Sequence, residues 1–201
     1  LTGKPWSEGT LPVGRHALQL YSRGTPNGAK VTVLLEELGV EYDAWHINLV
    51  LGEQYTSGFM EVNPNAMIPC LVDYTDPAAP VRLFESGSIL LYLADKYGKF
   101  VPSSRQARAE CLSWLFWQAG TGPYMGVFNI YYYYSRDEDK HKDSIDRWAL
   151  ENKRILAVLN ARLDGRMFVC GDEPSIADFA IVPWVRLFRG RPKIDQFLRL
   201  S

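Results

Sequence analysis

The order of strand-like and helix-like patterns near the start of this chain constrains its fold most. Residues 17–21 and 42–49 alternate between apolar and polar side chains, which is typical of half-buried strands. Between them, four apolar residues recur at helical spacing on one face. These residues are Val31, Leu34, Leu35 and Leu38. Gly39 then provides a natural helix stop. A strand–helix–strand segment of this length forms a βαβ unit, so the two strands should be parallel.

A hairpin and a second helix complete this first region. Residues 68–74 and 81–84 are strand-like, and the Pro- and Asp-containing segment between them predicts a β-hairpin. Ser86 is expected to cap a helix that ends near Gly98. With the polar segment that precedes the hairpin, the predicted order is βαβ-α-ββα, an α/β domain over residues 15–98.

The rest of the chain is patterned as helix. Residues 99–104 resemble a linker, and an all-α domain is expected over residues 105–201. One long helix is predicted from Arg105 to about Tyr134, and another from Asp143 to about Leu163. A further helix should begin at a capping box formed by Ser175 and Asp178.

The charge balance, the apolar runs and the cysteine spacing of the chain limit the kinds of partner and compartment to expect. The 201 residues include 22 basic and 23 acidic side chains, a net charge of -1, which gives no overall attraction to nucleic acid or to an anionic membrane. No apolar run approaches the roughly 20 residues needed to span a bilayer. Residues 1–14 do not resemble a secretory signal. The three cysteines are widely spaced, which favours a reducing, cytoplasmic compartment. No Cys/His group has metal-ligand spacing, so no metal is expected.

The Ile68-Pro69 pair stands where the second region of sheet begins. Proline cannot donate a hydrogen bond to a sheet, so Ile68 should be left without a ladder partner. One interpretation is a cis peptide bond beside which a bound peptide pairs with Ile68 as an added strand. The other is an ordinary proline at the edge of a sheet.

Two further motifs could bind a charged ligand. Ser86 lies at a helix N-terminus, which attracts a carboxylate, and Glu85 could hold an ammonium group beside it. Thr25 and Asn27 lie in a turn before a helix and could donate hydrogen bonds to a thiolate. In the alternative interpretations, Ser86 only caps its helix, Glu85 is a solvated charge, and Thr25 begins a plain helix-entry turn.

Taken together, these motifs resemble the glutathione transferase superfamily over nearly the whole chain, and most closely its nu class. Relatives in that class include bacterial glutathione-dependent disulfide-bond oxidoreductases and a fungal nitrogen regulator. The residues that carry the resemblance are 20–30 (LYSRGTPNGAK), 61–65 (EVNPN), Ile68-Pro69, 84–94 (FESGSILLYLA), 114–118 (WLFWQ), 175–178 (SIAD) and Trp184. The resemblance implies a thioredoxin-like N-terminal domain that binds glutathione, followed by an all-helical domain.

The resemblance also implies how glutathione would bind. Its γ-glutamyl head would lie on Glu85 and Ser86, its middle would cross Ile68, and its sulfur would face Thr25 and Asn27 as the catalytic pair. One or two glutathione molecules, or oxidised glutathione, would occupy each site as co-substrate.

Two more residues are assigned by the resemblance alone. Gln54 matches a position that contacts the glycyl end or a second glutathione, and Arg147 matches a basic residue that closes over the site from the helical domain. For Arg147 the alternative is a solvated helix charge. Tyr21 and Cys70 are expected to be core residues and not reactive groups.

Three functions remain open at this point. The first is an enzyme that uses bound glutathione to reduce disulfides or organic hydroperoxides. The second is a glutathione-binding regulatory protein with little turnover, and the third is a transferase that conjugates glutathione to an electrophile. The family likeness and an aromatic content of 13% also predict a homodimer.

Overall fold

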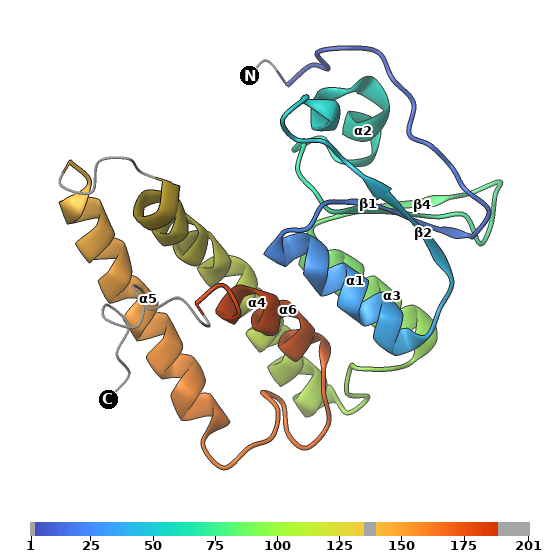
Figure 1. The fold of residues 1–201 in the computed structure, drawn as a ribbon. Helices are drawn as coiled ribbons and strands as arrows, with labels where there is room; N and C mark the ends of the chain where they lie inside the picture. The colour runs from blue at the N-terminus through green and yellow to red at the C-terminus, as the bar shows by residue number, and fades with distance from the viewer. Residues whose placement is uncertain (1–2, 135–139, 189–201) are drawn as a thin grey trace. The chain divides into compact units, whose positions relative to one another are not determined.

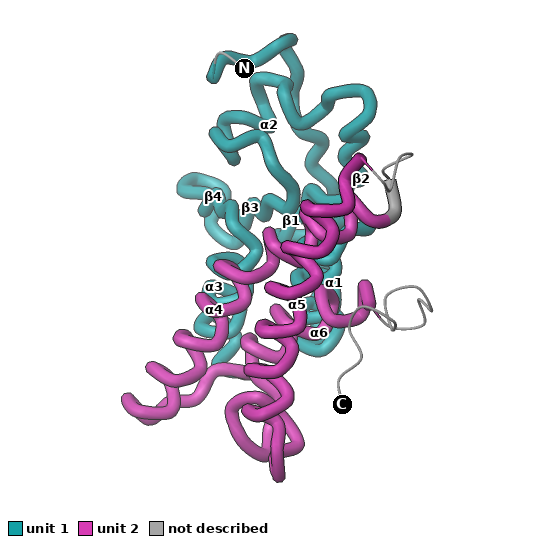
Figure 2. The backbone as a smooth tube through the Cα atoms, turned by 90° about the vertical axis from the view of Figure 1, so that its left-hand side faces the viewer, with its two compact units in different colours: residues 1–99 teal, residues 100–201 magenta. Residues whose placement is uncertain are grey.

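A computed structural model describes residues 3–134 and 140–188 of the chain. Contacts divide it into two compact units, residues 1–99 and 100–201, which Figure 2 colours separately. The change from one unit to the next falls at the start of the expected linker. Phe100 already belongs to the second unit, because its carbonyl accepts a hydrogen bond from the Ile176 N–H at 2.8 Å and its ring meets Phe179 edge-on.

The first unit is built on a four-stranded mixed sheet in the order β2-β1-β3-β4. Strand β1 (Leu18–Ser22) pairs parallel with β2 (Tyr42–His46) and antiparallel with β3 (Cys70–Asp73), and β3 pairs antiparallel with β4 (Val81–Phe84). The predicted βαβ unit and hairpin are therefore confirmed.

Strand β2 is shorter than the alternation of residues 42–49 predicts. It ends at His46, and the Asn48 side chain accepts hydrogen bonds from the N–H groups of Val50 and Leu51 at 3.0 and 3.3 Å. An Asx turn of this kind redirects the backbone. It ends the strand before the alternation in the sequence stops.

Helices cover both faces of this sheet (Figure 1). Helices α1 (Pro26–Leu38) and α3 (Ser86–Tyr97) pack against each other on one face, while the 3-10 turn η1 (Glu53–Tyr55) and α2 (Ser57–Val62) lie toward the other. Apolar side chains of the sheet and of both α1 and α3 are fully buried. They include Leu20, Leu34, Leu71, Ile89 and Leu93. This sandwich is the thioredoxin-like arrangement that the family resemblance implies.

The second unit is helical, as predicted. It contains α4 (Arg105–Asn129), α5 (Lys142–Leu163) and α6 (Ile176–Val185), and α4 packs against both of the others. The long predicted helix does not stay regular to its end, because residues 130–134 form a π-helical turn, the element η2 (Ile130–Tyr134). The remainder of the predicted helical domain, residues 135–139 and 189–201, lies outside the described residues.

The predicted capping box at the start of α6 is confirmed. Both the N–H and the hydroxyl of Ser175 donate to Asp178 at 2.9 Å, and the second carboxylate oxygen accepts from the Val169 N–H at 2.8 Å. The box therefore also anchors the loop that precedes the helix. Within the described residues, no helix is both long and apolar enough to cross a membrane.

Candidate functional site

The sheet register brings three separated segments to one edge of the first unit. Tyr21 near the end of β1 pairs with Cys70 at the start of β3, and Cys70 pairs with Phe84 at the end of β4. Directly beyond these three paired residues lie the turn after β1, the Ile68-Pro69 pair and the Glu85-Ser86 pair. Five of the seven predicted site residues thus lie at the same end of the sheet.

The turn after β1 is compact and ends in a helix cap. Thr25 is the N-cap of α1, and its Oγ1 accepts a hydrogen bond from the Gly28 N–H at 3.2 Å. Because that oxygen acts as the acceptor, its own hydrogen remains available to donate. A side chain at Gly28 would collide with the Arg23 carbonyl oxygen, only 2.1 Å from where a Cβ would stand, so the turn requires glycine there. Asn27 follows half-buried in the first turn of α1.

The entry to β3 leaves a short backbone segment outside the sheet. The Ile68–Pro69 peptide bond is cis, the first of the two interpretations of this proline. Sheet pairing begins only at Cys70. The N–H and C=O of Ile68 form no backbone hydrogen bond with another described residue, and Ile68 itself is half-buried. An extended peptide could therefore pair with this segment.

The start of α3 differs from the prediction in one respect. Glu85, not Ser86, is the N-cap residue, and its side chain makes no capping hydrogen bond. Glu85 also has φ of 66° and ψ of 115°. A non-glycine residue with such a positive φ is uncommon and costs about 1–3 kcal/mol, and such residues cluster at functional sites. The first N–H groups of α3 thus receive no hydrogen bond from the side chain of the N-cap residue, and the exposed Glu85 carboxylate lies beside them, an arrangement that suits a zwitterion.

Ser86 is the first residue inside α3, and its side chain faces the neighbouring helix α1. Lys30 of α1 donates a hydrogen bond from Nζ to Ser86 Oγ at 3.3 Å, and the two residues are only 3% and 7% exposed. Burial lowers the pKa of Lys30 to about 8, although the nearby Glu85 carboxylate acts in the opposite direction. That shift corresponds to roughly 3 kcal/mol against the charged form.

Lys30 has no assigned role in the sequence interpretation, although it lies within the matching segment. A signal for it exists in the sequence. Lys30 precedes Leu34 by four residues, so it falls on the apolar face of its own helix. Lysine is rarely fully buried unless it is paired, so a lysine on that face indicates a special environment.

The rival reactive groups are buried, as predicted. Tyr21 is fully buried, its hydroxyl donates to the Pro12 carbonyl at 2.8 Å, and burial raises its pKa far above the usual value. Cys70 is also fully buried, and burial raises the pKa of its thiol to about 12. Neither group is suited to act as a nucleophile or to activate one near neutral pH.

Gln54 lies on η1, which follows β2, and is 8% exposed. Its Nε2 makes only a long hydrogen bond of 3.5 Å to the Leu49 carbonyl. Its Oε1 is buried and has no hydrogen-bond partner among the described residues. A buried acceptor left unpaired costs about 1–3 kcal/mol, so Gln54 has unused hydrogen-bonding capacity.

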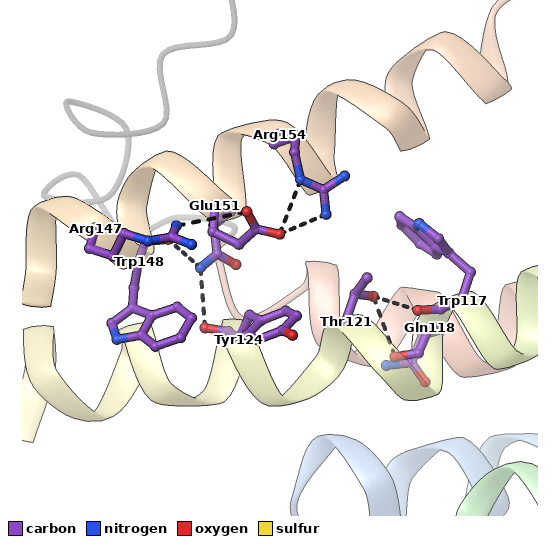
Figure 3. Close-up of polar contacts among 9 residues, drawn as sticks. Trp117, Gln118, Thr121, Tyr124, Arg147, Trp148, Glu151 and Arg154 are labelled. Carbon is purple, nitrogen blue, oxygen red and sulfur yellow. Dashed lines mark hydrogen bonds and ion pairs between the residues drawn. The ribbon is translucent and has the colours of Figure 1, made fainter.

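Arg147 belongs to α5 of the second unit (Figure 3). Its guanidinium lies 3.8 Å from Glu151 and 5.5 Å from the ring centre of Trp148, and its side chain is 60% exposed. Glu151 also pairs with Arg154 at 2.6 Å, while the Trp148 ring stacks on Tyr124. These contacts hold Arg147 loosely, as expected for a charge on a solvated helix face. Its predicted closure over a ligand stays a prediction.

Two family models match this chain, one in each compact unit. Residues 16–95 match the family model described as glutathione S-transferase, N-terminal domain, and residues 142–198 match the corresponding C-terminal domain. In the described part of the chain, no group of His, Cys, Asp and Glu is placed to hold a metal ion.

The chain is also similar to individual members of this family. It is 52% identical over 187 residues to the disulfide-bond oxidoreductase YghU of Escherichia coli, covering 90% of this chain but only 64% of that protein. It is 39% identical to the E. coli disulfide-bond oxidoreductase YfcG, covering 89% of this chain and 83% of that one. A solved glutathione transferase from Burkholderia graminis, with two glutathione molecules bound per subunit, superimposes with a TM-score of 0.85 at 41% identity, covering 91% of this chain and 77% of that one. The chain belongs to the glutathione S-transferase family, in the nu-class branch that its sequence motifs predict.

Proposed function

We propose that this chain uses bound glutathione to reduce disulfide bonds. The observation that carries the proposal is the alignment at one sheet edge of the Thr25 turn, the unpaired backbone of Ile68 and the uncapped start of α3 at Glu85 and Ser86. These groups match the sulfur, the central peptide and the zwitterionic head of glutathione. The relatives YghU and YfcG, both named disulfide-bond oxidoreductases, support the same reaction.

In the proposed complex, the α-ammonium of the γ-glutamyl head pairs with Glu85, and its α-carboxylate binds Ser86 and the first N–H groups of α3. The cysteinyl residue pairs with the backbone of Ile68, which places its sulfur toward Thr25 and Asn27. Each site takes one or two glutathione molecules, or oxidised glutathione. Gln54 contacts the glycyl end or the second molecule.

The proposed reaction needs no protein thiol. Donors at Thr25 and Asn27 stabilise the glutathione thiolate, which attacks one sulfur of the substrate disulfide. A mixed disulfide forms and the other substrate sulfur leaves as a thiolate. A second glutathione thiolate attacks the glutathione sulfur of this intermediate. Oxidised glutathione is then released, together with the second substrate thiolate.

Several finer features belong to the same proposal. Organic hydroperoxides are further candidate acceptors for the same thiolate, and Arg147 closes the site from a helical domain at residues 105–201. The glutathione-binding domain spans residues 15–98, and the protein acts in the cytoplasm. The alternatives are a glutathione-binding regulatory protein with little turnover and a transferase for electrophiles. Turnover with glutathione and a small disulfide distinguishes the proposed enzyme from the regulatory protein.

Glutathione affinity should depend on Ser86 and Glu85. Ser86→Ala removes a hydrogen bond to the ligand carboxylate and should weaken binding by about 1–2 kcal/mol. Glu85→Gln should act similarly because it removes the charge opposite the ligand ammonium. Calorimetric titration measures both affinities, with the exposed Ser88→Ala as a control in the same helical turn. Wild-type affinity in both Ser86→Ala and Glu85→Gln would remove the assigned head-group site.

Thr25 and Asn27 should set the reactivity of the bound sulfur, while the Tyr21 hydroxyl should be dispensable. Thr25→Ala and Asn27→Ala should raise the pKa of the bound thiol, because a donor to the thiolate is lost. Each unit of that shift lowers the thiolate fraction about tenfold below the pKa. The rate of disulfide reduction against pH measures the shift. Tyr21→Phe serves as the matched control; if it lost most activity while the other two variants kept theirs, the assignment would be wrong.

The protein should form a homodimer. Sedimentation velocity at micromolar concentration should show one species of twice the mass of a single chain. A species with the mass of one chain across that range would contradict the dimer and leave the proposed reaction unaffected.

A further inference from the structure

We propose that Lys30 is a positioning residue of the head-group site: its buried ammonium orients the Ser86 hydroxyl toward the ligand α-carboxylate and supplies the positive charge behind it. The inference rests on the proposed binding of the γ-glutamyl head at Glu85 and Ser86. It adds a residue from α1 to a site otherwise built from the start of α3.

The direction of the Lys30–Ser86 hydrogen bond is fixed by chemistry. An ammonium group can only donate, so Ser86 Oγ is the acceptor in the 3.3 Å contact. The hydroxyl hydrogen of Ser86 must then point away from Lys30. Ser86 is the first residue of α3, so in the proposed complex that hydrogen is available to donate to the carboxylate bound at the start of the helix. Lys30 thereby favours the hydroxyl rotamer that adds one more donor to the carboxylate site.

The charge of Lys30 also completes the match to a zwitterion. Glu85 supplies a full negative charge for the ligand ammonium, whereas the helix N-terminus alone offers only about half a positive charge to the carboxylate. Lys30 supplies the missing full charge from a position that is 3% exposed, where little solvent screens it. The unfavourable burial of this ammonium before ligand binding is consistent with a functional site.

Several charged residues lie on the elements of the first unit that surround Lys30. Glu85 is the group whose charge acts on the Lys30 pKa. Strand β1 behind α1 carries no charged side chain. Helix α1 carries Glu36 and Glu37 farther along, and α3 carries Asp95 and Lys96 at its far end. Asp73 of β3 pairs with Lys96.

A ligand carboxylate beside Lys30 must favour the protonated form. The pKa of Lys30 without ligand lies near 8, so the ammonium is largely present at pH 7 and largely lost at pH 9. Binding then raises this pKa, and near pH 8 the protein takes up a fraction of a proton. Affinity should therefore be full below about pH 7 and should decrease as pH rises through 8.

The test compares wild type with Lys30→Met by calorimetry, using S-methylglutathione as the ligand because it has no thiol to titrate. At pH 7 the variant should bind about tenfold or more weakly, the loss expected for one charge-assisted contact. Between pH 7 and 9.5 wild-type affinity should fall toward that of the variant. Titration at pH 8 in two buffers of different ionisation enthalpy should show proton uptake that Lys30→Met lacks. The ligand amine titrates equally in both proteins and cancels from the difference.

Two controls separate binding from folding. The exposed Lys99→Met should keep the wild-type affinity and pH profile. Lys30→Met removes a buried charge, so its melting temperature at pH 7 should be no lower than that of wild type. The difference in melting temperature between Lys30→Met and wild type should shrink from pH 8 to 10.5, because Lys30 loses its proton at lower pH in the folded wild type than in the unfolded chain. Lys30→Arg, which keeps a positive charge that does not titrate in this range, serves as a second reference for the proton uptake of wild type near pH 8.

The possible outcomes are distinct. Equal affinity and an equal pH profile in wild type and Lys30→Met would overturn the role of Lys30 and leave the proposed function intact. Equal proton uptake on ligand binding at pH 8 in wild type and Lys30→Met would also overturn the role of Lys30 and leave the proposed function intact. Failure of wild type to bind both glutathione and S-methylglutathione would overturn the proposed function itself, and with it the role of Lys30.

Discussion

The pairing of Tyr21 with Cys70, and of Cys70 with Phe84, is the constraint on which the candidate site depends. A slip of one residue in either pairing would turn every side chain of that strand to the opposite face and bury polar groups in the core. Leu20 and Leu71 pair with each other and are both buried in the core, and this packing favours the observed register. Core packing therefore determines where three distant segments meet.

Two helix N-termini and one buried charge arise at that edge as a consequence. Helix α1 begins at the Thr25 cap directly after β1, and α3 begins at Glu85 directly after β4. Because α1 and α3 pack side by side, Lys30 reaches Ser86 across their interface. The same interface that stabilises the domain thus places an ammonium behind the proposed carboxylate site. Stability and recognition conflict here, since burial disfavours the charged form of Lys30.

Sequence patterns predicted the features that depend on local periodicity and capping. The βαβ order and the capping box at Ser175 and Asp178 follow from side-chain spacing and local hydrogen bonds, and both are confirmed. The core position of Tyr21 was expected from the family resemblance and is also confirmed. The positions of Gln54 and Arg147 came from family likeness alone. The contacts predicted for Gln54 and Arg147 are with bound glutathione, so the pattern of the chain's own residues does not predict them.

The features that the sequence did not predict depend on tertiary contacts. Ser86 was expected to cap α3, but its oxygen faces Lys30, a partner 56 residues away. Lys30 was overlooked because a lysine in a helix is usually solvated, and only packing of α3 against α1 buries it. The π-helical turn at residues 130–134 likewise has no signal in a run of aromatic residues whose spacing fits an ordinary helix.

In the proposed reaction the attacking sulfur belongs to glutathione and not to the protein. The rival nucleophiles are Cys111 and Cys170 of the second unit, where a hydrogen bond from Cys170 lowers the pKa of Cys111 to about 7. Cys111 is fully buried, however, and cannot meet a substrate disulfide without local opening. The most direct measurement is glutathione-dependent disulfide reduction by a folded variant in which Cys70, Cys111 and Cys170 are all replaced by alanine. Turnover close to that of wild type is the predicted result, and loss of turnover in the folded variant would contradict the account.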